Sequence, residues 1–163
     1  MTMLKSVATS ILALAAFSSA AYAQTASTTF DVTITITSSC SIDTPAATDV
    51  AFGAQPSTAT DIDAAGLLNV NCTPGTPYSI ALNEGLNGVD VASRAMTDGT
   101  TLVPYQLYQD PGRTTVWGET TGTNTLAGTG TGAVQPIPVY GRVPNANFPA
   151  ASYADTVTAT ITY

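Results

Sequence analysis

The chain has 163 residues, a formal net charge of −7 and no histidine. So acidic a chain is a poor partner for nucleic acid or for an anionic membrane surface, because both carry negative charge. Without histidine it also lacks the commonest general base and the commonest transition-metal ligand. With 44% hydrophobic residues and only 9% charged ones, the composition is nevertheless that of a chain able to build a core.

Residues 1–23 have the features of a secretory signal peptide. Lys5 gives a positive start, residues 7–17 are mostly apolar, and Ala21-Tyr22-Ala23 fits a cleavage site of small residues. The apolar stretch is shorter than the ~20 residues that a membrane-spanning helix needs. We therefore expect export without membrane insertion, and a mature chain of one domain in which three arginines face eleven acidic residues, a charge of 3 − 11 = −8.

The chain contains two cysteines, Cys40 and Cys72. An even count in an exported chain favours a disulfide between them, with two free thiols as the alternative. Closing a loop of about 33 residues would stabilise the fold by roughly 3 to 4 kcal/mol in the chain-entropy model. Paired cysteines would supply neither a nucleophile nor a zinc site.

The first predicted strand covers residues 28–40, "TTFDVTITITSSC". It alternates with period two, as a half-buried strand does, with threonines and one aspartate on the opposite face. The apolar face is formed by Phe30, Val32, Ile34 and Ile36. A long amphipathic strand left unpaired is a template for aggregation, so this face must be buried in some core.

Further short alternating runs follow, separated by Gly, Pro, Asn and Asp clusters. The pattern predicts strands at residues 67–72, 78–83, 102–109, 114–118, 135–143 and 153–163, with short candidates at 50–53 and within 89–96. Pro-Gly pairs predict type II turns at residues 73–76, where they close a hairpin, and at 110–113. Residues 119–132 are expected to be a long connection. Together these elements predict an all-β, antiparallel sandwich of immunoglobulin-like kind.

The sequence offers little sign of a chemical site. The Asp61-Ile62-Asp63 run lacks the later ligands of a calcium loop, and the Gly/Thr-rich run at residues 128–132 lacks the spacing of a dinucleotide fingerprint. Catalytic residues, cofactors and metals are therefore predicted to be absent. An aromatic group could stack on sugars, although such residues more often form core and rim: it comprises Tyr105, Tyr108, Trp117 and Tyr140.

Five segments together resemble the spore coat protein U domain family, which includes the major subunits of archaic chaperone-usher pili. They are FDVTITITSSC (30–40), VNCTPGTPYSIAL (70–82), YQLYQDPGRTTVWG (105–118), VYGRVP (139–144) and DTVTATITY (155–163). The resemblance covers essentially the whole mature chain, in the family's order.

The resemblance implies an incomplete sandwich that lacks one strand and is completed by a donor strand from a neighbouring subunit. Residues 24–37 would be this donor segment, contacting the neighbour through Phe30, Val32, Ile34 and Ile36, and residues 38–163 would form the domain. The implied partners are neighbouring copies in a homopolymer, a periplasmic chaperone, an outer-membrane usher and a tip adhesin. The product would be an extracellular fibre of a Gram-negative bacterium.

The leading hypothesis is thus a structural, non-enzymatic fibre subunit serving adhesion or biofilm formation. Three features of the sequence support it: an exported single domain, one amphipathic strand before Cys40, and the absence of a recognisable catalytic or metal-binding motif. Three alternatives remain. One is a secreted coat protein that forms no pilus, and another is a monomeric sandwich that buries its own first strand and binds glycans through Tyr105, Tyr108 or Trp117. The weakest is an enzyme, which saturable turnover lost on changing one specific acidic residue would support.

Overall fold

The structure is a computed structural model that describes residues 22–43 and 46–163. Most of the predicted signal peptide, residues 1–21, lies outside the described residues. The chain divides into two units, one ending at Thr35 and the other formed by Ile36–Tyr163. In the described part of the first unit, residues 22–35, no strand forms.

The second unit is built from nine strands, and its described residues contain no helix. The strands are β1 (Cys40–Ile42), β2 (Thr60–Cys72), β3 (Pro77–Leu82), β4 (Ala95–Thr97), β5 (Leu102–Pro104), β6 (Gln106–Tyr108), β7 (Leu126–Thr129), β8 (Gln135–Asn145) and β9 (Ala159–Thr162).

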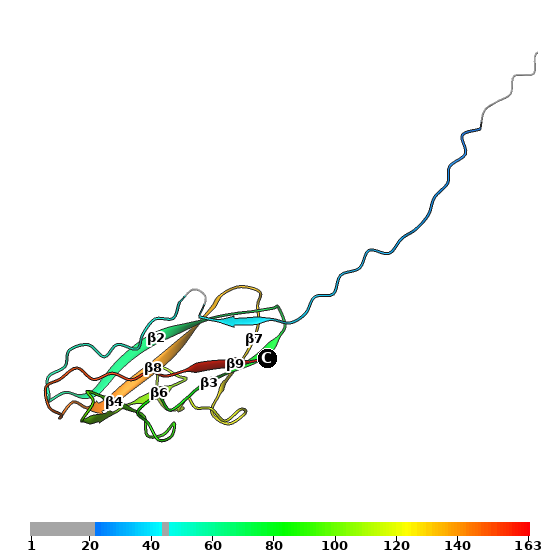
Figure 1. The fold of residues 1–163 in the computed structure, drawn as a ribbon. Coiled ribbons are helices and arrows are strands. Elements are labelled where there is room, and N and C mark those ends of the chain that lie inside the picture. The colour runs from blue at the N-terminus through cyan, green and yellow to red at the C-terminus, as the bar shows by residue number, and fades with distance from the viewer. Residues whose placement is uncertain (1–21, 44–45) are drawn as a thin grey trace, which may run out of the picture. The chain divides into compact units, whose positions relative to one another are not determined.

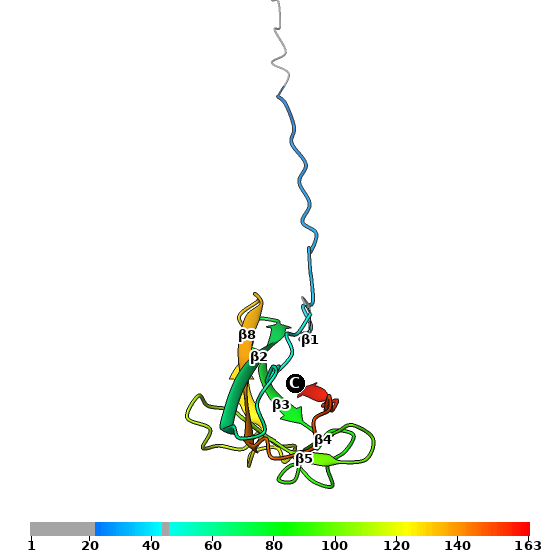
Figure 2. The same ribbon diagram turned by 90° about the vertical axis from the view of Figure 1, so that its left-hand side faces the viewer.

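These strands pair antiparallel in three sheets. The orders are β1-β2-β8-β6 in the first, β7-β3-β9 in the second, and β4-β5 in a short third sheet. Figure 2 shows β2 and β8 in one layer and β3 in the other, and Figure 1 shows β9 running beside β3. The predicted all-β, immunoglobulin-like sandwich is confirmed.

The core lies between the two larger sheets and is formed by alternate residues of the strands. On β3, Tyr78, Ile80 and Leu82 are buried, as the period-two pattern predicts. On β8, Val139 and Val143 are buried while their neighbours are more exposed. Because side chains on a strand alternate between faces, the outward positions remain polar or small.

The turn at residues 73–76 forms as predicted, but the predicted hairpin is wrong. The Thr76 amide donates to the Thr73 carbonyl at 3.1 Å, and Gly75 has φ +77°, which a type II turn requires at that position. However, β2 belongs to the four-stranded sheet and β3 to the three-stranded one. The turn therefore passes the chain from one layer to the other.

Several other predicted elements differ from the structure. The predicted strand at 102–109 is split at Tyr105, whose amide donates to the Arg94 carbonyl, so β5 pairs with β4 and β6 with β8. At residues 110–113 the positive φ falls on Arg113 and not on Gly112, so this turn is not type II. Residues 119–132 contain β7, whereas 50–53 and 114–118 form no strand.

A disulfide joins Cys40 and Cys72, which face each other across β1 and β2. Cys72 is 1% exposed and belongs to the core. Next to the disulfide, Ser39 and Thr73 are joined by two hydrogen bonds. The Thr73 amide donates to the Ser39 carbonyl at 2.9 Å, and the Ser39 amide donates to the Thr73 hydroxyl. Ser39 is thus held against Thr73 of its own domain.

Candidate functional site

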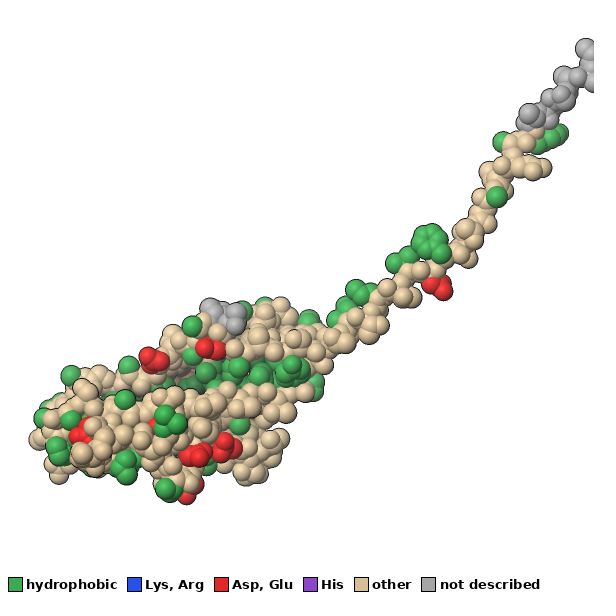
Figure 3. All heavy atoms as spheres, in the orientation of Figure 1, with side chains coloured by type: hydrophobic (Ala, Val, Ile, Leu, Met, Phe, Trp, Pro, Cys, Tyr) green, Lys and Arg blue, Asp and Glu red, His purple; other side chains and the backbone are tan. Residues whose placement is uncertain are grey.

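A deep groove of about 1050 Å³ opens along one flank of the sandwich. This is at or above the size of pockets that hold drug-sized ligands. One wall is the segment 47–57, which precedes β2, and the other is the segment 149–157 continuing into Ala159 of β9. Figure 3 shows a band of hydrophobic side chains between two ridges on this face of the domain.

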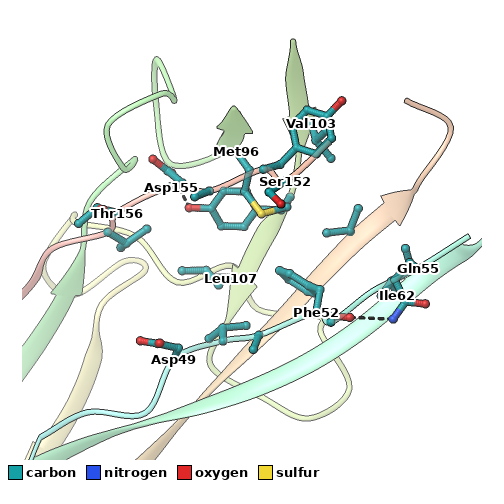
Figure 4. A pocket seen from close by; sticks show the side chains of 18 of the residues that line it. Asp49, Phe52, Gln55, Ile62, Met96, Val103, Leu107, Ser152, Asp155 and Thr156 are labelled. Carbon is teal, nitrogen blue, oxygen red and sulfur yellow. Dashed lines mark hydrogen bonds between the residues drawn. The ribbon is translucent and has the colours of Figure 1, made fainter. Parts of the chain in front are cut away.

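The floor of the groove is apolar and comes from both layers. Figure 4 shows Leu107 between the wall that carries Phe52 and the wall that carries Asp155. Most floor residues are buried or nearly so, and they belong to the same core cluster as the sandwich interior. The other floor residues are Ile62, Leu68, Leu82, Met96, Val103, Tyr105, Val139 and Val143. The groove is therefore an opening into the core.

The wall at 47–57 packs closely on two glycines. Thr48 bridges to Leu67 through two main-chain hydrogen bonds of 2.9 and 3.2 Å. A Cβ on Gly66 would lie within 3.0 Å of the main chain of this segment, and one on Gly141 would meet the Val50 and Phe52 side chains. Both glycines thus leave room for the wall to sit against β2 and β8.

The opposite wall ends in an unpaired strand edge. Within the described parts of the chain, β9 pairs with β3 on one side and has no strand on the other, since it stands last in its sheet. The Asn83 amide donates to the Thr158 carbonyl, and the pairing continues through Ala81–Thr160 and Ser79–Thr162. Hydrogen-bonded pairs alternate in an antiparallel ladder, so the even-numbered residues of β9 bond β3.

The odd-numbered residues of this wall consequently direct their main-chain N–H and C=O groups toward the open edge. The same residues, Val157, Ala159 and Ile161, are half-buried on the inward face, whereas the threonines between them are exposed. Farther along the wall, Ala154 exchanges main-chain hydrogen bonds of 2.9 and 3.1 Å with Thr97. Here too an even-numbered residue bonds away from the open edge. The wall offers a further strand both a hydrogen-bonding edge and apolar contacts.

Asp155 is the single charged side chain among the inward residues of this wall, and both of its carboxylate oxygens accept hydrogen bonds. Its carboxylate accepts hydrogen bonds from the Tyr105 hydroxyl at 2.7 Å, from the Leu86 amide at 2.9 Å and from the Asn87 side chain at 2.8 Å. Burial and the adjacent carboxylate together raise the pKa of Tyr105, which is 7% exposed. These bonds tie the wall to the loop after β3.

Away from the groove, the sandwich is closed around Trp117 and Arg94, both 0% exposed. The Trp117 indole donates to the Ile80 carbonyl. The Arg94 guanidinium donates to the carbonyls of Leu82 and Trp117 at 2.8 Å and to the Gln106 side chain at 2.7 Å. Burial lowers the pKa of Arg94. Sequence reasoning missed this residue, since nothing around it marks a buried cation.

The aromatic group divides between core and rim, as the sequence favoured over a sugar-binding platform, with Tyr108 half-buried on β6. Trp117 and Tyr105 lie in the core, and Tyr140 is covered by the Arg113 guanidinium, 5.8 Å from the ring centre. Arg113 and Arg142 both contact Asp63, at 3.0 and 2.7 Å. All three arginines of the predicted mature chain are therefore occupied within the domain, and the other charged side chains among the described residues are acidic.

The predicted donor residues are strongly exposed. Phe30 is 83%, Val32 85%, Ile34 85% and Ile36 77% exposed. The described residues include no cluster of three His, Cys, Asp or Glu side chains that could hold a metal ion. No helix in the described parts of the chain is long and apolar enough to cross a membrane.

Comparison with known proteins gave three results. The family model of the Spore Coat Protein U domain matches residues 26–160. Protein U of Myxococcus xanthus is 39% identical over 111 residues, covering 63% of this chain and 62% of Protein U. A solved structure shares the fold at 22% identity and a TM-score of 0.58, covering 79% of this chain and 40% of the other. It is the CsuC–CsuE chaperone–tip adhesion subunit pre-assembly complex from archaic chaperone-usher Csu pili of Acinetobacter baumannii.

Proposed function

The chain belongs to the Spore Coat Protein U domain family, and from this premise we propose that it is the structural subunit of a bacterial surface fibre of the chaperone-usher type. Subunits polymerise by donor-strand exchange, in which residues 24–37 of one copy fill the groove of the next. The observation that carries the proposal is the coexistence, in one chain, of an open apolar groove and an exposed strand-forming segment of matching character.

The chemistry of the two surfaces is complementary. A strand laid along β9 would bond its main chain to the open edge and direct alternate side chains to the floor, which is the general mode of β-strand addition. Four apolar side chains at roughly 1.5 to 3 kcal/mol each would stabilise the insertion by about 6 to 12 kcal/mol before ordering costs. Insertion also removes two exposed apolar surfaces at once.

The polarity of the domain supports one direction for the donor strand. Cys40, where the chain enters the sandwich, lies at the same end as the C-terminus, and β1 contacts β9 there. We place the neighbour's body at the other end, beyond residues 149–152. Its donor strand then enters from that end and runs antiparallel to β9. One surface meeting a different one in this way produces an open filament.

Insertion into the groove of the same copy is disfavoured. Ser39 is held by Thr73 in its own domain, so the chain would have to reverse within Thr37 and Ser38. Two-residue reversals between strands need positive φ angles, which Gly, Asn and Asp adopt far more readily than threonine or serine. A second copy avoids this turn.

The proposal includes the partners that such a groove requires. Before assembly, a periplasmic chaperone covers the groove with a strand of its own, and an outer-membrane usher exchanges that strand for the donor of the next subunit. The fibre then stands on the cell surface, with a tip adhesin at its end and a role in adhesion or biofilm formation. The CsuC–CsuE complex, in which a chaperone accompanies a pilus subunit, supports this by likeness of fold.

A gel experiment tests the proposal. Surface material is sheared from the native organism and run on a denaturing gel, with and without boiling, and this chain is detected with an antibody. We expect a ladder at multiples of one mature subunit that collapses on boiling, because inserted strands are kinetically trapped. Monomer alone in both lanes would contradict exchange and leave a non-pilus coat role.

A further inference from the structure

The length of the groove and the sizes of its side chains indicate which donor residue lies opposite which residue of β9. This inference rests on the proposed strand exchange. The groove lining on the C-terminal wall extends from residue 149 to Ala159 and stops before Ile161. Within that stretch the inward-facing residues are Tyr153, Asp155, Val157 and Ala159, which are half-buried and alternate with exposed neighbours. Four inward positions thus stand ready for four apolar donor residues.

The sizes of the side chains point to the same alignment. Ala159 is the smallest of the four inward residues and lies beside the buried Leu82. Phe30 is the largest of the donor residues and comes first in the chain. Facing positions pack best when large side chains meet small ones. In an antiparallel pair, the first donor residue lies opposite the last groove residue.

We infer that Phe30 of one copy lies opposite Ala159 of the next, which places Val32 opposite Val157 and Ile34 opposite Asp155. The last match is compatible with burial, because three donors already satisfy the Asp155 carboxylate and direct it toward Tyr105. The Tyr105 hydroxyl lies 2.7 Å from this carboxylate, and Figure 4 shows Asp155 on the side of the groove opposite Phe52. Asp155 thereby leaves the apolar floor free for Ile34.

This register has a consequence on the outer face of the joined strands. Thr33 of the donor would lie directly opposite Thr156, which is exposed. The even-numbered residues on either side, Ala154 and Thr158, bond away from the open edge, to Thr97 and Asn83. In the same phase, the Thr33–Thr156 pair is a non-hydrogen-bonded one, with Cα atoms about 4.5 Å apart. That separation lies within the range that a disulfide can bridge.

Disulfide trapping tests the register in the full chain. The variant combines Thr33→Cys with Thr156→Cys, and two controls combine Thr33→Cys with Thr158→Cys or with Ala154→Cys, each shifted by two residues. Assembled fibres are oxidised and then boiled without reductant. We expect a covalent ladder that survives boiling in the first variant and at least tenfold less of it in the controls.

The outcomes separate the register from the exchange itself. A stronger ladder from either control would overturn the register and keep the exchange. A boil-sensitive ladder without any covalent product would mean that the donor does not pair with β9, which also overturns the register. If even the unboiled lanes show monomer, the proposed function fails.

A size swap tests the Phe30–Ala159 match by another route. Ala159→Phe alone should reduce the unboiled ladder at least tenfold, because two phenylalanines would compete for one space. Adding Phe30→Ala to the same chain should restore the ladder to within about threefold of wild type. If the double variant stays as defective as Ala159→Phe, and circular dichroism shows both to be folded, the two side chains do not face each other.

Discussion

Two segments of this chain have nearly the same sequence pattern and opposite environments. Each segment begins with an aspartate and continues with apolar residues that alternate with threonines. The segments are residues 31–38, "DVTITITS", and residues 155–162, "DTVTATIT". The second segment leads into β9, pairs with β3, and half-buries Val157, Ala159 and Ile161. In the first, Val32 and Ile34 are 85% exposed and no strand forms.

The difference shows that an alternating sequence favours a β-strand, but that the strand forms only where a neighbouring strand is available to pair with it. β9 pairs with β3 within its own domain. The N-terminal segment finds no such partner there, while β9 itself keeps one edge unpaired. An unpaired edge and an unpaired strand in one chain are both hazards for aggregation, and pairing them between copies resolves both.

The largest effect is expected from a charge on the apolar face of the N-terminal segment. Ile34→Asp should abolish the boil-sensitive ladder, since it loses about 1.5 to 3 kcal/mol of burial and places a carboxylate on an apolar floor. The matched control is Thr35→Asp, one residue along on the outer face, which should keep the ladder. Loss of the ladder in the control as well would argue against a one-sided contact.

The next effect concerns β3, the strand with which β9 pairs, whose last residue, Leu82, is held by Arg94. Arg94→Leu should lower the free energy of unfolding by about 3 to 5 kcal/mol, because the buried carbonyls of Leu82 and Trp117 lose their donor. Urea denaturation of the monomer measures this. Arg142→Leu removes a partly exposed arginine and should cost much less, because ion pairs near the surface contribute little to stability. Equal losses in the two variants would contradict a structural role specific to Arg94.

A smaller effect is expected from narrowing the groove. Gly141→Val would push against Val50 and Phe52, and overpacking of this kind costs about 1 to 3 kcal/mol. The wall should move into the groove and slow the growth of the ladder. Ala65→Val, at an exposed position of β2 outside the groove lining, serves as the control and should assemble at the wild-type rate.

The smallest effect concerns pH and the exposed ion pairs. The hydrogen bond from Arg142 lowers the pKa of Asp63 below its ordinary value. A carboxyl whose pKa is lower in the folded state stabilises the fold above its unfolded pKa and loses that contribution as the pH falls through the folded value. Stability should thus decline below about pH 4.

Asp63→Asn is the test of this assignment. It should be slightly less stable than wild type at neutral pH and converge with it in acid, as thermal melts at a series of pH values would reveal. A difference that persists unchanged at pH 2 would mean that Asp63 acts through something other than its charge.

Much of the fold follows from the sequence because alternation survives in the long strands. Ile80 and Leu82 on β3, and Val139 and Val143 on β8, are buried as their spacing predicts. The failures occur where the partner strand decides. The Pro-Gly turn after Cys72 looks like a hairpin locally, yet the strands on either side join different sheets, which only tertiary packing determines.

The groove was harder to predict than the strand proposed to fill it. Its wall at residues 47–57 carries only the short strand candidate 50–53, which forms no strand. The wall depends on the space left by Gly66 and Gly141, whose role is visible only in three dimensions. The engagement of Asp155 by Tyr105 and Leu86 joins residues far apart in the sequence. Four alternating apolar residues before Cys40, in contrast, are evident in the sequence itself.

The most direct test of strand exchange is amide hydrogen exchange along β9, measured residue by residue in fibres and in the Ile34→Asp monomer. The amides of Val157, Ala159 and Ile161 should exchange rapidly in the monomer and become protected in the fibre, whereas those of Thr160 and Thr162, which bond β3, should be protected in both. Odd-numbered amides that stay unprotected in the fibre, or are already protected in the monomer, would contradict the account.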